Sequence, residues 1–113
     1  MFSWLSKKEK TIYYDFETTG LNQYHDKIIE YAFITEKDGN RDKDIFTNLV
    51  NPETKLDNKI ISITKITDDM LINKSPIWQQ VPKLIKFIES DYGTKYLIAH
   101  NNDGFDKIIL YNT

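Results

Sequence analysis

Residues 11–21 read TIYYDFETTGL, and this stretch decides the fold. Its first six residues are rich in β-branched and aromatic side chains, which favours a strand, and a turn follows them. Side chains two positions apart on a strand share a face, so Asp15 and Glu17 project together while Phe16 faces the other way. The aromatic neighbours predict a buried strand that carries a pair of carboxylates on one face.

The next two segments predict two further strands. Residues 27–35 (KIIEYAFIT) form a near-continuous apolar run that is interrupted by Glu30, as expected of a strand that is covered on both faces. Asp38 and Gly39 then give a hairpin signal, and residues 45–50 form the returning strand. The first half of the chain therefore predicts three strands, two of them joined by a tight turn.

The second half changes to helical periodicity. Residues 60–66 predict a short, broken helix, and residues 67–71 predict an N-cap with one helical turn. Ser75-Pro76 opens a longer helix, in which Pro82 predicts a kink or a start near Val81. A short buried strand at residues 96–99 and a helix from about residue 105 complete a mixed α/β domain.

Composition excludes several classes of protein. The chain has 113 residues, of which 40% are hydrophobic, so it has enough apolar material for one core. It lacks cysteine, which excludes disulfide scaffolds, thiolate metal sites and cysteine nucleophiles and fits an intracellular location, in the cytoplasm or nucleus or in a viral protein. No uncharged apolar stretch approaches the length of a membrane span. The net charge of −2 argues against a duplex-binding surface built on lysine and arginine.

Two groups of residues carry candidate chemistry. Asp15 and Glu17 repel each other unless a proton or a hard divalent cation compensates their charge, although two solvated carboxylates on a surface strand are an equal alternative. The second group runs from His100 to Asp106, from a strand end into a helix. There Asp106 is a candidate site residue or an ordinary acid in a first helical turn, and His100 a candidate or a hydrogen-bonded core histidine.

Four segments in order make the combination specific. They are DFETTGL at 15–21, KIIEYA at 27–32, ITDDML at 66–71 and AHN through FD at 99–106. Together they resemble the DnaQ-like (DEDD) 3′→5′ exonucleases over residues 11–111. The resemblance implies an RNase H-like fold with a mixed sheet, residues 1–10 as an N-terminal extension and residues 11–113 as an exonuclease domain.

The resemblance also implies roles for individual residues. Asp15, Glu17 and Asp106 would bind a pair of Mg²⁺ or Mn²⁺ ions, which neutralise the scissile phosphate. A second set of residues would hold a single-stranded 3′ end of DNA or RNA, from which nucleoside 5′-monophosphates are then released. Those expected to contact the strand are Thr18, Thr19, Gly20, Leu21, Ile66, Thr67, His100 and Asn101.

The chain departs from the family pattern in two ways. The family's third motif, a histidine and an aspartate on a C-terminal helix, has no counterpart after Asp106, so the domain is expected to be truncated. Lys65 stands where the family usually has glycine, which could alter packing of the terminal base. The alternative function is therefore a catalytically inactive module that binds nucleic-acid ends or a protein, with a polymerase or the missing C-terminal part as partner.

Overall fold

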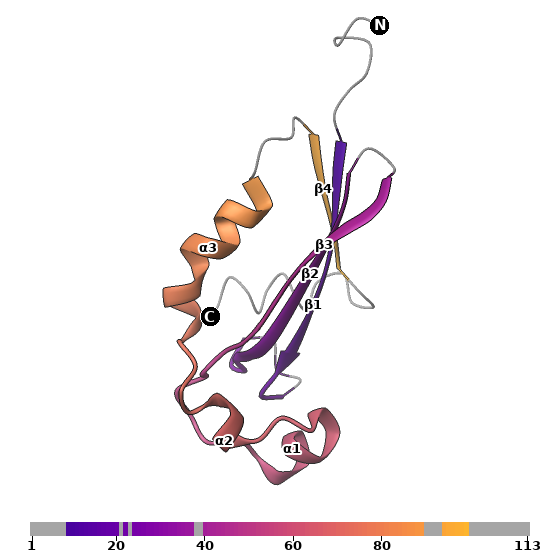
Figure 1. The fold of residues 1–113 in the computed structure, drawn as a ribbon. Helices are drawn as coiled ribbons and strands as arrows, with labels where there is room; N and C mark the ends of the chain where they lie inside the picture. The colour runs from indigo at the N-terminus through magenta and orange to yellow at the C-terminus, as the bar shows by residue number, and fades with distance from the viewer. Residues whose placement is uncertain (1–8, 21, 23, 38–39, 90–93, 100–113) are drawn as a thin grey trace, which may run out of the picture.

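The computed structural model describes residues 9–20, 22, 24–37, 40–89 and 94–99 (Figure 1). These described residues form three strands, followed by three helices and a fourth strand, so the predicted mixed α/β fold is confirmed. In chain order the elements are β1 (Glu9–Thr18), β2 (Ile28–Lys37), β3 (Asn40–Leu49), α1 (Asn58–Thr64), α2 (Asp68–Leu71), α3 (Ile77–Glu89) and β4 (Thr94–Ala99).

The four strands form one sheet in the order β3-β2-β1-β4. β1, β2 and β3 pair antiparallel, as the predicted hairpin requires, whereas β4 pairs parallel to β1. β3 begins five residues before the predicted strand, because it pairs with β2 as far as Asn40. β1 lies at the centre of the sheet, with a neighbour on each side.

One face of the sheet packs against α3, which lies alongside the strands in Figure 1. Ile12, Phe16, Tyr31 and Phe33 point from β1 and β2 into this core and are at most 7% exposed. α3 contributes Leu84, which is 3% exposed. Burying a large apolar side chain stabilises the fold by about 1.5–3 kcal/mol, so this cluster holds helix and sheet together.

Lys10 joins the start of β1 to the end of α3. Its side chain is 1% exposed, and its Nζ donates a hydrogen bond of 2.7 Å to the carbonyl oxygen of Phe87 and one of 3.4 Å to that of Ile88. The last carbonyls of a helix have no partner within the helix, and a lysine near the helix end satisfies them well. This contact fixes where α3 ends on the sheet.

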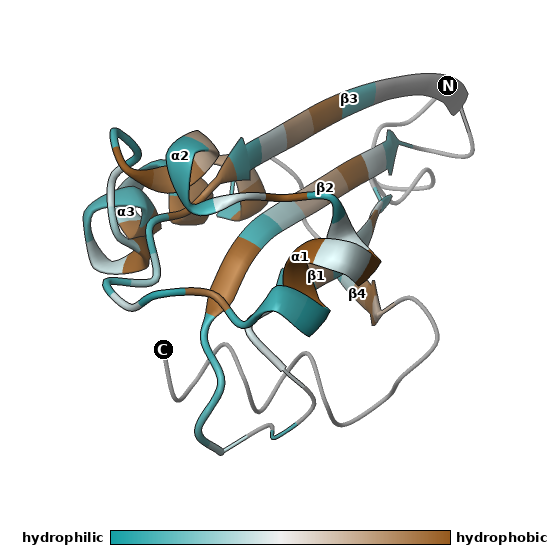
Figure 2. Ribbon diagram, turned by 90° about the horizontal axis from the view of Figure 1, so that it is seen from below, coloured by the Kyte–Doolittle hydropathy of each residue, from teal (hydrophilic) through white to brown (hydrophobic). Residues whose placement is uncertain are grey.

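A second cluster joins α1 and α2 to β2. Ile29, Leu56, Ile66 and Leu71 are each at most 5% exposed and pack together. Figure 2 views the two short helices from below and shows the hydrophobic stretches of β2 beside them. Because Ile28 belongs to the α3 core and Ile29 to this cluster, β2 buries adjacent residues in two different places.

Three sequence predictions need correction. α3 begins at Ile77 and not near Val81, since the proline ring of the exposed Pro82 is accommodated within the helix. β2 is not covered on both faces along its length. Tyr31 and Phe33 are buried in the α3 core and Ile29 in the second cluster, whereas Ala32 and Ile34 are only half-buried.

The third correction concerns β4, which is a strand but is not buried. Tyr96, Leu97 and Ile98 are 48%, 56% and 45% exposed. Among the described elements β4 pairs with β1 alone and lies at the edge of the sheet. No described helix is long and apolar enough to cross a membrane.

Candidate metal and nucleic-acid site

The C-terminal end of strand β1 presents two carboxylates on the face away from α3. Phe16 points into the core and is 7% exposed, whereas Asp15 on its N-terminal side is exposed and Glu17 is half-buried. The alternation of the strand thus places both carboxylates together, as their spacing predicts. The backbone N–H of Phe16 donates a 3.0 Å hydrogen bond to Asp15 Oδ1.

Glu30 on β2 adds a third carboxylate beside this pair. The antiparallel register pairs Glu17 directly with Glu30, and Asp15 with Ala32. Directly paired residues of adjacent strands share a face and have their Cβ atoms about 5 Å apart. The sequence alone did not single out Glu30, because its position beside Glu17 depends on the register in which β2 pairs with β1. That register shifts between Glu17 and Thr18 and cannot be read from either strand by itself.

This crowding has an electrostatic consequence at Glu17. Partial burial raises the pKa of the Glu17 carboxyl above its ordinary value of 4.5, and the negative charges of Asp15 and Glu30 raise it further. A bound cation would offset both effects, and carboxylate oxygens are the ligands that Mg²⁺ and Mn²⁺ prefer. Asp15 and Glu17 therefore fit a hard divalent cation, although the described residues include no group of three or more acidic or histidine side chains arranged to hold one.

The loop after β1 is held in shape by side chains. Thr18 Oγ1 donates to the carbonyl oxygen of Gly20 at 2.6 Å, and Thr19 Oγ1 donates to Asp26 Oδ1 at 2.9 Å. The backbone N–H of Lys27 in turn donates to Thr19 Oγ1 at 2.9 Å. These hydrogen bonds tie the segment after β1 to the residues that precede β2, so Thr18 and Thr19 shape the loop beside the carboxylates.

Gly20 lies against Asp26, a residue that sequence reasoning did not assign to the site. A Cβ atom at position 20 would lie 2.5 Å from Asp26 Oδ2 and 2.9 Å from its Cγ, closer than atoms can approach. Glycine therefore permits the carboxylate of Asp26 to reach Thr19. The pairing is visible only in the fold, because Gly20 and Asp26 are six positions apart in the sequence.

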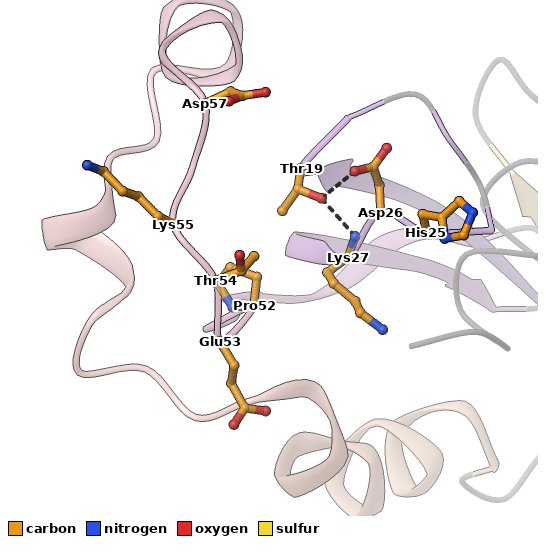
Figure 3. Close-up of a pocket in the computed structure, with 9 residues that line it drawn as sticks. All are labelled: Thr19, His25, Asp26, Lys27, Pro52, Glu53, Thr54, Lys55 and Asp57. Atoms are coloured by element: carbon orange, nitrogen blue, oxygen red, sulfur yellow. Dashed lines mark hydrogen bonds between the residues drawn. The ribbon is translucent and has the colours of Figure 1, made fainter.

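A groove of about 650 Å³ opens beside this loop (Figure 3). Thr19, His25, Asp26 and Lys27 line one side, and residues 52–55 and 57, which follow β3, line the other. Thr19 belongs both to this groove and to the loop after β1. The groove therefore lies next to the end of the strand that carries Asp15 and Glu17.

Ile66 and Thr67 both have structural roles, one in the second cluster and one at the start of α2. Ile66 is 5% exposed within the second cluster, and Thr67 caps α2 by accepting a 3.4 Å hydrogen bond from the backbone N–H of Met70. Lys65 ends α1 with a φ of 64°, in the left-handed region that favours glycine. The contact of Ile66 and Thr67 with a terminal base stays a prediction.

The other candidate residues lie outside the described part of the chain. They are Leu21, His100, Asn101 and Asp106. The described part of β4 ends at Ala99, whose partner in the parallel register is Tyr14, the residue before Asp15. The roles assigned to the four undescribed residues remain predictions.

The inner strand β1 with its two carboxylates and the mixed sheet define an α/β domain with a candidate metal site. The family described as "Exonuclease" (RNase_T) matches residues 12–113. The chain therefore belongs to the DnaQ-like 3′→5′ exonuclease family.

Curated relatives of the chain are bacterial DNA polymerases. "DNA polymerase III PolC-type" of Bacillus cereus is 36% identical over 117 aligned positions, which cover 96% of this chain and 8% of the relative. The protein of that name from Staphylococcus haemolyticus is 39% identical over 95 positions, covering 83% of this chain and 6% of the relative. The chain thus matches only a small part of each of these polymerases.

Solved structures show the same fold. The nuclease domain of 3′hExo, a DEDDh family member bound to rAMP, matches 90% of this chain and 58% of its own with a TM-score of 0.74 and 23% identity. Exonuclease X in complex with 5′ overhanging duplex DNA matches 88% of this chain and 52% of its own, with a TM-score of 0.63 and 25% identity. The described strands and helices therefore correspond to about half of each exonuclease structure.

Proposed function

We propose that the chain is the exonuclease domain of a metal-dependent 3′→5′ exonuclease, which releases nucleoside 5′-monophosphates from the 3′ end of a nucleic acid. The observation that carries the proposal is the pair Asp15 and Glu17 on one face at the end of β1, in a chain of this family. The PolC-type relatives favour DNA as the substrate and a replication polymerase as the partner.

Asp15 and Glu17 are proposed to hold the metal ions, together with Asp106. When bound, a pair of Mg²⁺ or Mn²⁺ ions supplies charge neutralisation for the scissile phosphate and an activated water. Glu17 contributes as an anion whose own pKa is raised, so it binds a cation and a proton in competition. The sheet holds both carboxylates because they belong to its central strand.

The loop formed by Thr18, Thr19 and Gly20 is proposed to receive the terminal nucleotide. Its shape is fixed before any ligand binds, because Thr19 hydrogen bonds to Asp26 and Lys27 and Thr18 to Gly20. A preformed loop loses less conformational entropy on binding than a disordered one. The adjacent groove offers space for the strand to continue away from the carboxylates.

Trimming of a 5′-labelled oligonucleotide in Mn²⁺, combined with Mn²⁺ calorimetry, tests the proposal. Asp15→Asn and Glu17→Gln should each lower trimming by at least about 10²-fold, because each removes a charge that holds metal. Glu89→Gln, an exposed carboxylate at the far end of α3, is the matched control and should trim as the wild type does. DNA and RNA oligonucleotides of one sequence distinguish the two substrates.

Trimming that is unchanged in both site variants would refute the assignment of Asp15 and Glu17. If the 113-residue chain binds Mn²⁺ and oligonucleotide 3′ ends without trimming them, the catalytic proposal fails for this chain. The alternative of a binding module would then be correct.

A further inference from the structure

A second polar pocket lies on the α3 side of the sheet, on the face opposite to the carboxylates. Its volume is about 230 Å³, and it opens between β3, the segment before α3 and the first turns of α3. Tyr31 and Asn48, which are register partners on β2 and β3, form its floor. Because Tyr31 also pairs with the core residue Phe16, this floor faces away from Asp15 and Glu17.

Hydrogen bonds fix the wall of this pocket. The buried Tyr31 donates from Oη to Gln80 Oε1 at 2.7 Å and accepts from Asn48 Nδ2 at 3.1 Å. Gln80 Nε2 donates to the carbonyl oxygens of Ser75 at 2.7 Å and Leu49 at 3.1 Å. Burial raises the pKa of the Tyr31 phenol, which keeps its proton available for Gln80. The wall is therefore ordered without any ligand.

The rim of the pocket carries positive charge that no acidic group balances. Lys74 and Lys83 line the pocket, and its lining includes no carboxylate in the part of the chain that the structure describes. Both lysines are exposed, and neither forms an ion pair with a described residue. Clustered positive charge without a counter-ion favours an anion.

Neutral hydrogen-bond donors add to this charge. Asn73, Ser75 and Gln79 also line the pocket, and their side chains hydrogen bond to none of the described residues. An amide and a hydroxyl can each donate to an oxyanion without adding charge. Two ammonium groups and several neutral donors around one cavity are the chemistry that recognises phosphate.

We infer that this pocket, defined by Lys74 and Lys83, binds a phosphate group at a second site, on the face of the sheet opposite to the carboxylates. Phosphate has two possible sources here, a backbone phosphate of a bound nucleic acid or a free monophosphate. That either one meets the protein during its reaction rests on the proposed function. The affinity of the pocket for phosphate itself does not.

The test measures binding of inorganic phosphate to the full chain in EDTA, at constant ionic strength, by NMR of backbone amides. Saturable shifts should concentrate at residues 73–75, 79–81 and 83. Lys74→Gln with Lys83→Gln should weaken binding at least about tenfold, because charge-assisted hydrogen bonds contribute most to phosphate affinity. Lys59→Gln with Lys86→Gln removes the same charge from exposed helix positions outside the pocket and should leave binding within about twofold of the wild type.

Absence of saturable shifts at millimolar phosphate would overturn the inference, and so would equal weakening in the two double variants. The same variants are then titrated with a nucleoside 5′-monophosphate and with a single-stranded oligonucleotide. A backbone phosphate predicts that the pocket variant alone binds oligonucleotide more weakly, with its salt dependence reduced by about 1–2 phosphate contacts. If the ligand is a free monophosphate, the pocket variant should lose monophosphate binding and keep its oligonucleotide binding.

Metal is absent and cleavage is not measured in this experiment. A negative result therefore removes the phosphate pocket and leaves the exonuclease proposal standing. Conversely, a chain that fails to trim oligonucleotides can still bind phosphate at Lys74 and Lys83.

Discussion

Substituting Gly20 by alanine tests whether the loop after β1 depends on Asp26. The new Cβ would lie 2.5 Å from Asp26 Oδ2 and 3.0 Å from Oδ1, so the carboxylate must move away. Moving it breaks two hydrogen bonds, from Thr19 Oγ1 at 2.9 Å and from the backbone N–H of Asn22 at 2.8 Å. Hydrogen bonds to charged groups contribute about 1.5–3 kcal/mol each, and Asp26 is only half-buried, so we expect a loss at the low end, about 2–3 kcal/mol in total.

The assay is urea denaturation of a double-mutant cycle with Gly20→Ala and Asp26→Ala. In a domain of about 100 residues the expected loss lowers Tm by about 10–20 °C. Asp26→Ala alone should cost a similar amount, because it removes the same two hydrogen bonds. With the carboxylate gone, Gly20→Ala should cost nothing or stabilise by about 0.4–1 kcal/mol through the unfolded chain. The coupling energy between the two sites is therefore about 2–3 kcal/mol.

Two results would refute this reasoning. A cost below about 0.5 kcal/mol for Gly20→Ala in the wild type would show that the loop relaxes without losing its hydrogen bonds. An equal cost in the wild type and in the Asp26→Ala background would show that the methyl group clashes with something other than Asp26.

Three further changes test the electrostatics and packing. Glu17 binds its proton more tightly in the folded than in the unfolded state, so the metal-free wild type should lose stability as pH rises from about 4.5 through the raised pKa. Glu17→Gln should abolish this loss in Tm measured between about pH 4 and pH 7, and identical profiles would contradict the shift. Lys65→Gly should stabilise by about 0.5–1 kcal/mol in urea, because residue 65 has a φ of 64°, whereas Lys59→Gly within α1 should destabilise by about 1 kcal/mol. Leu84→Ala should lower the free energy of unfolding by about 2–5 kcal/mol with an unchanged m-value, because Leu84 is 3% exposed in the main core.

Local signals predicted most of the fold. The alternation of residues 12–17 indicated a strand with its carboxylates opposite Phe16, and the structure places Phe16 in the core and Asp15 outside it. Thr67 was expected to cap a helical turn, and its side chain accepts the N–H of Met70. These features depend on neighbours within four residues, which is the range over which sequence patterns act directly.

What sequence did not reveal depends on how distant segments meet. Glu30 lies beside Glu17 because β2 pairs with β1 in one particular register, which shifts at the end of β1. Asp26 reaches Thr19 because the loop before β2 turns back on the end of β1. The exposure of β4 follows from its position at the edge of the described sheet, although its residues Tyr96–Ile98 are as apolar as those of a buried strand.

The two faces of β1 have different roles: one packs into the core and the other carries the carboxylates. Ile12 and Phe16 hold the strand in the main core, so the position of Asp15 and Glu17 is set by packing on the other face. Partial burial and the neighbouring charges of Asp15 and Glu30 raise the pKa of Glu17, so its ionised form is expected to destabilise the metal-free fold. Neutralising Glu17 should therefore make the protein more stable and less able to hold metal, whereas truncating Phe16 should lower stability and metal affinity together. Such opposite responses from adjacent residues would show that β1 carries a binding site on one face. At a functional site, residues needed for binding are kept even though replacing them would stabilise the fold.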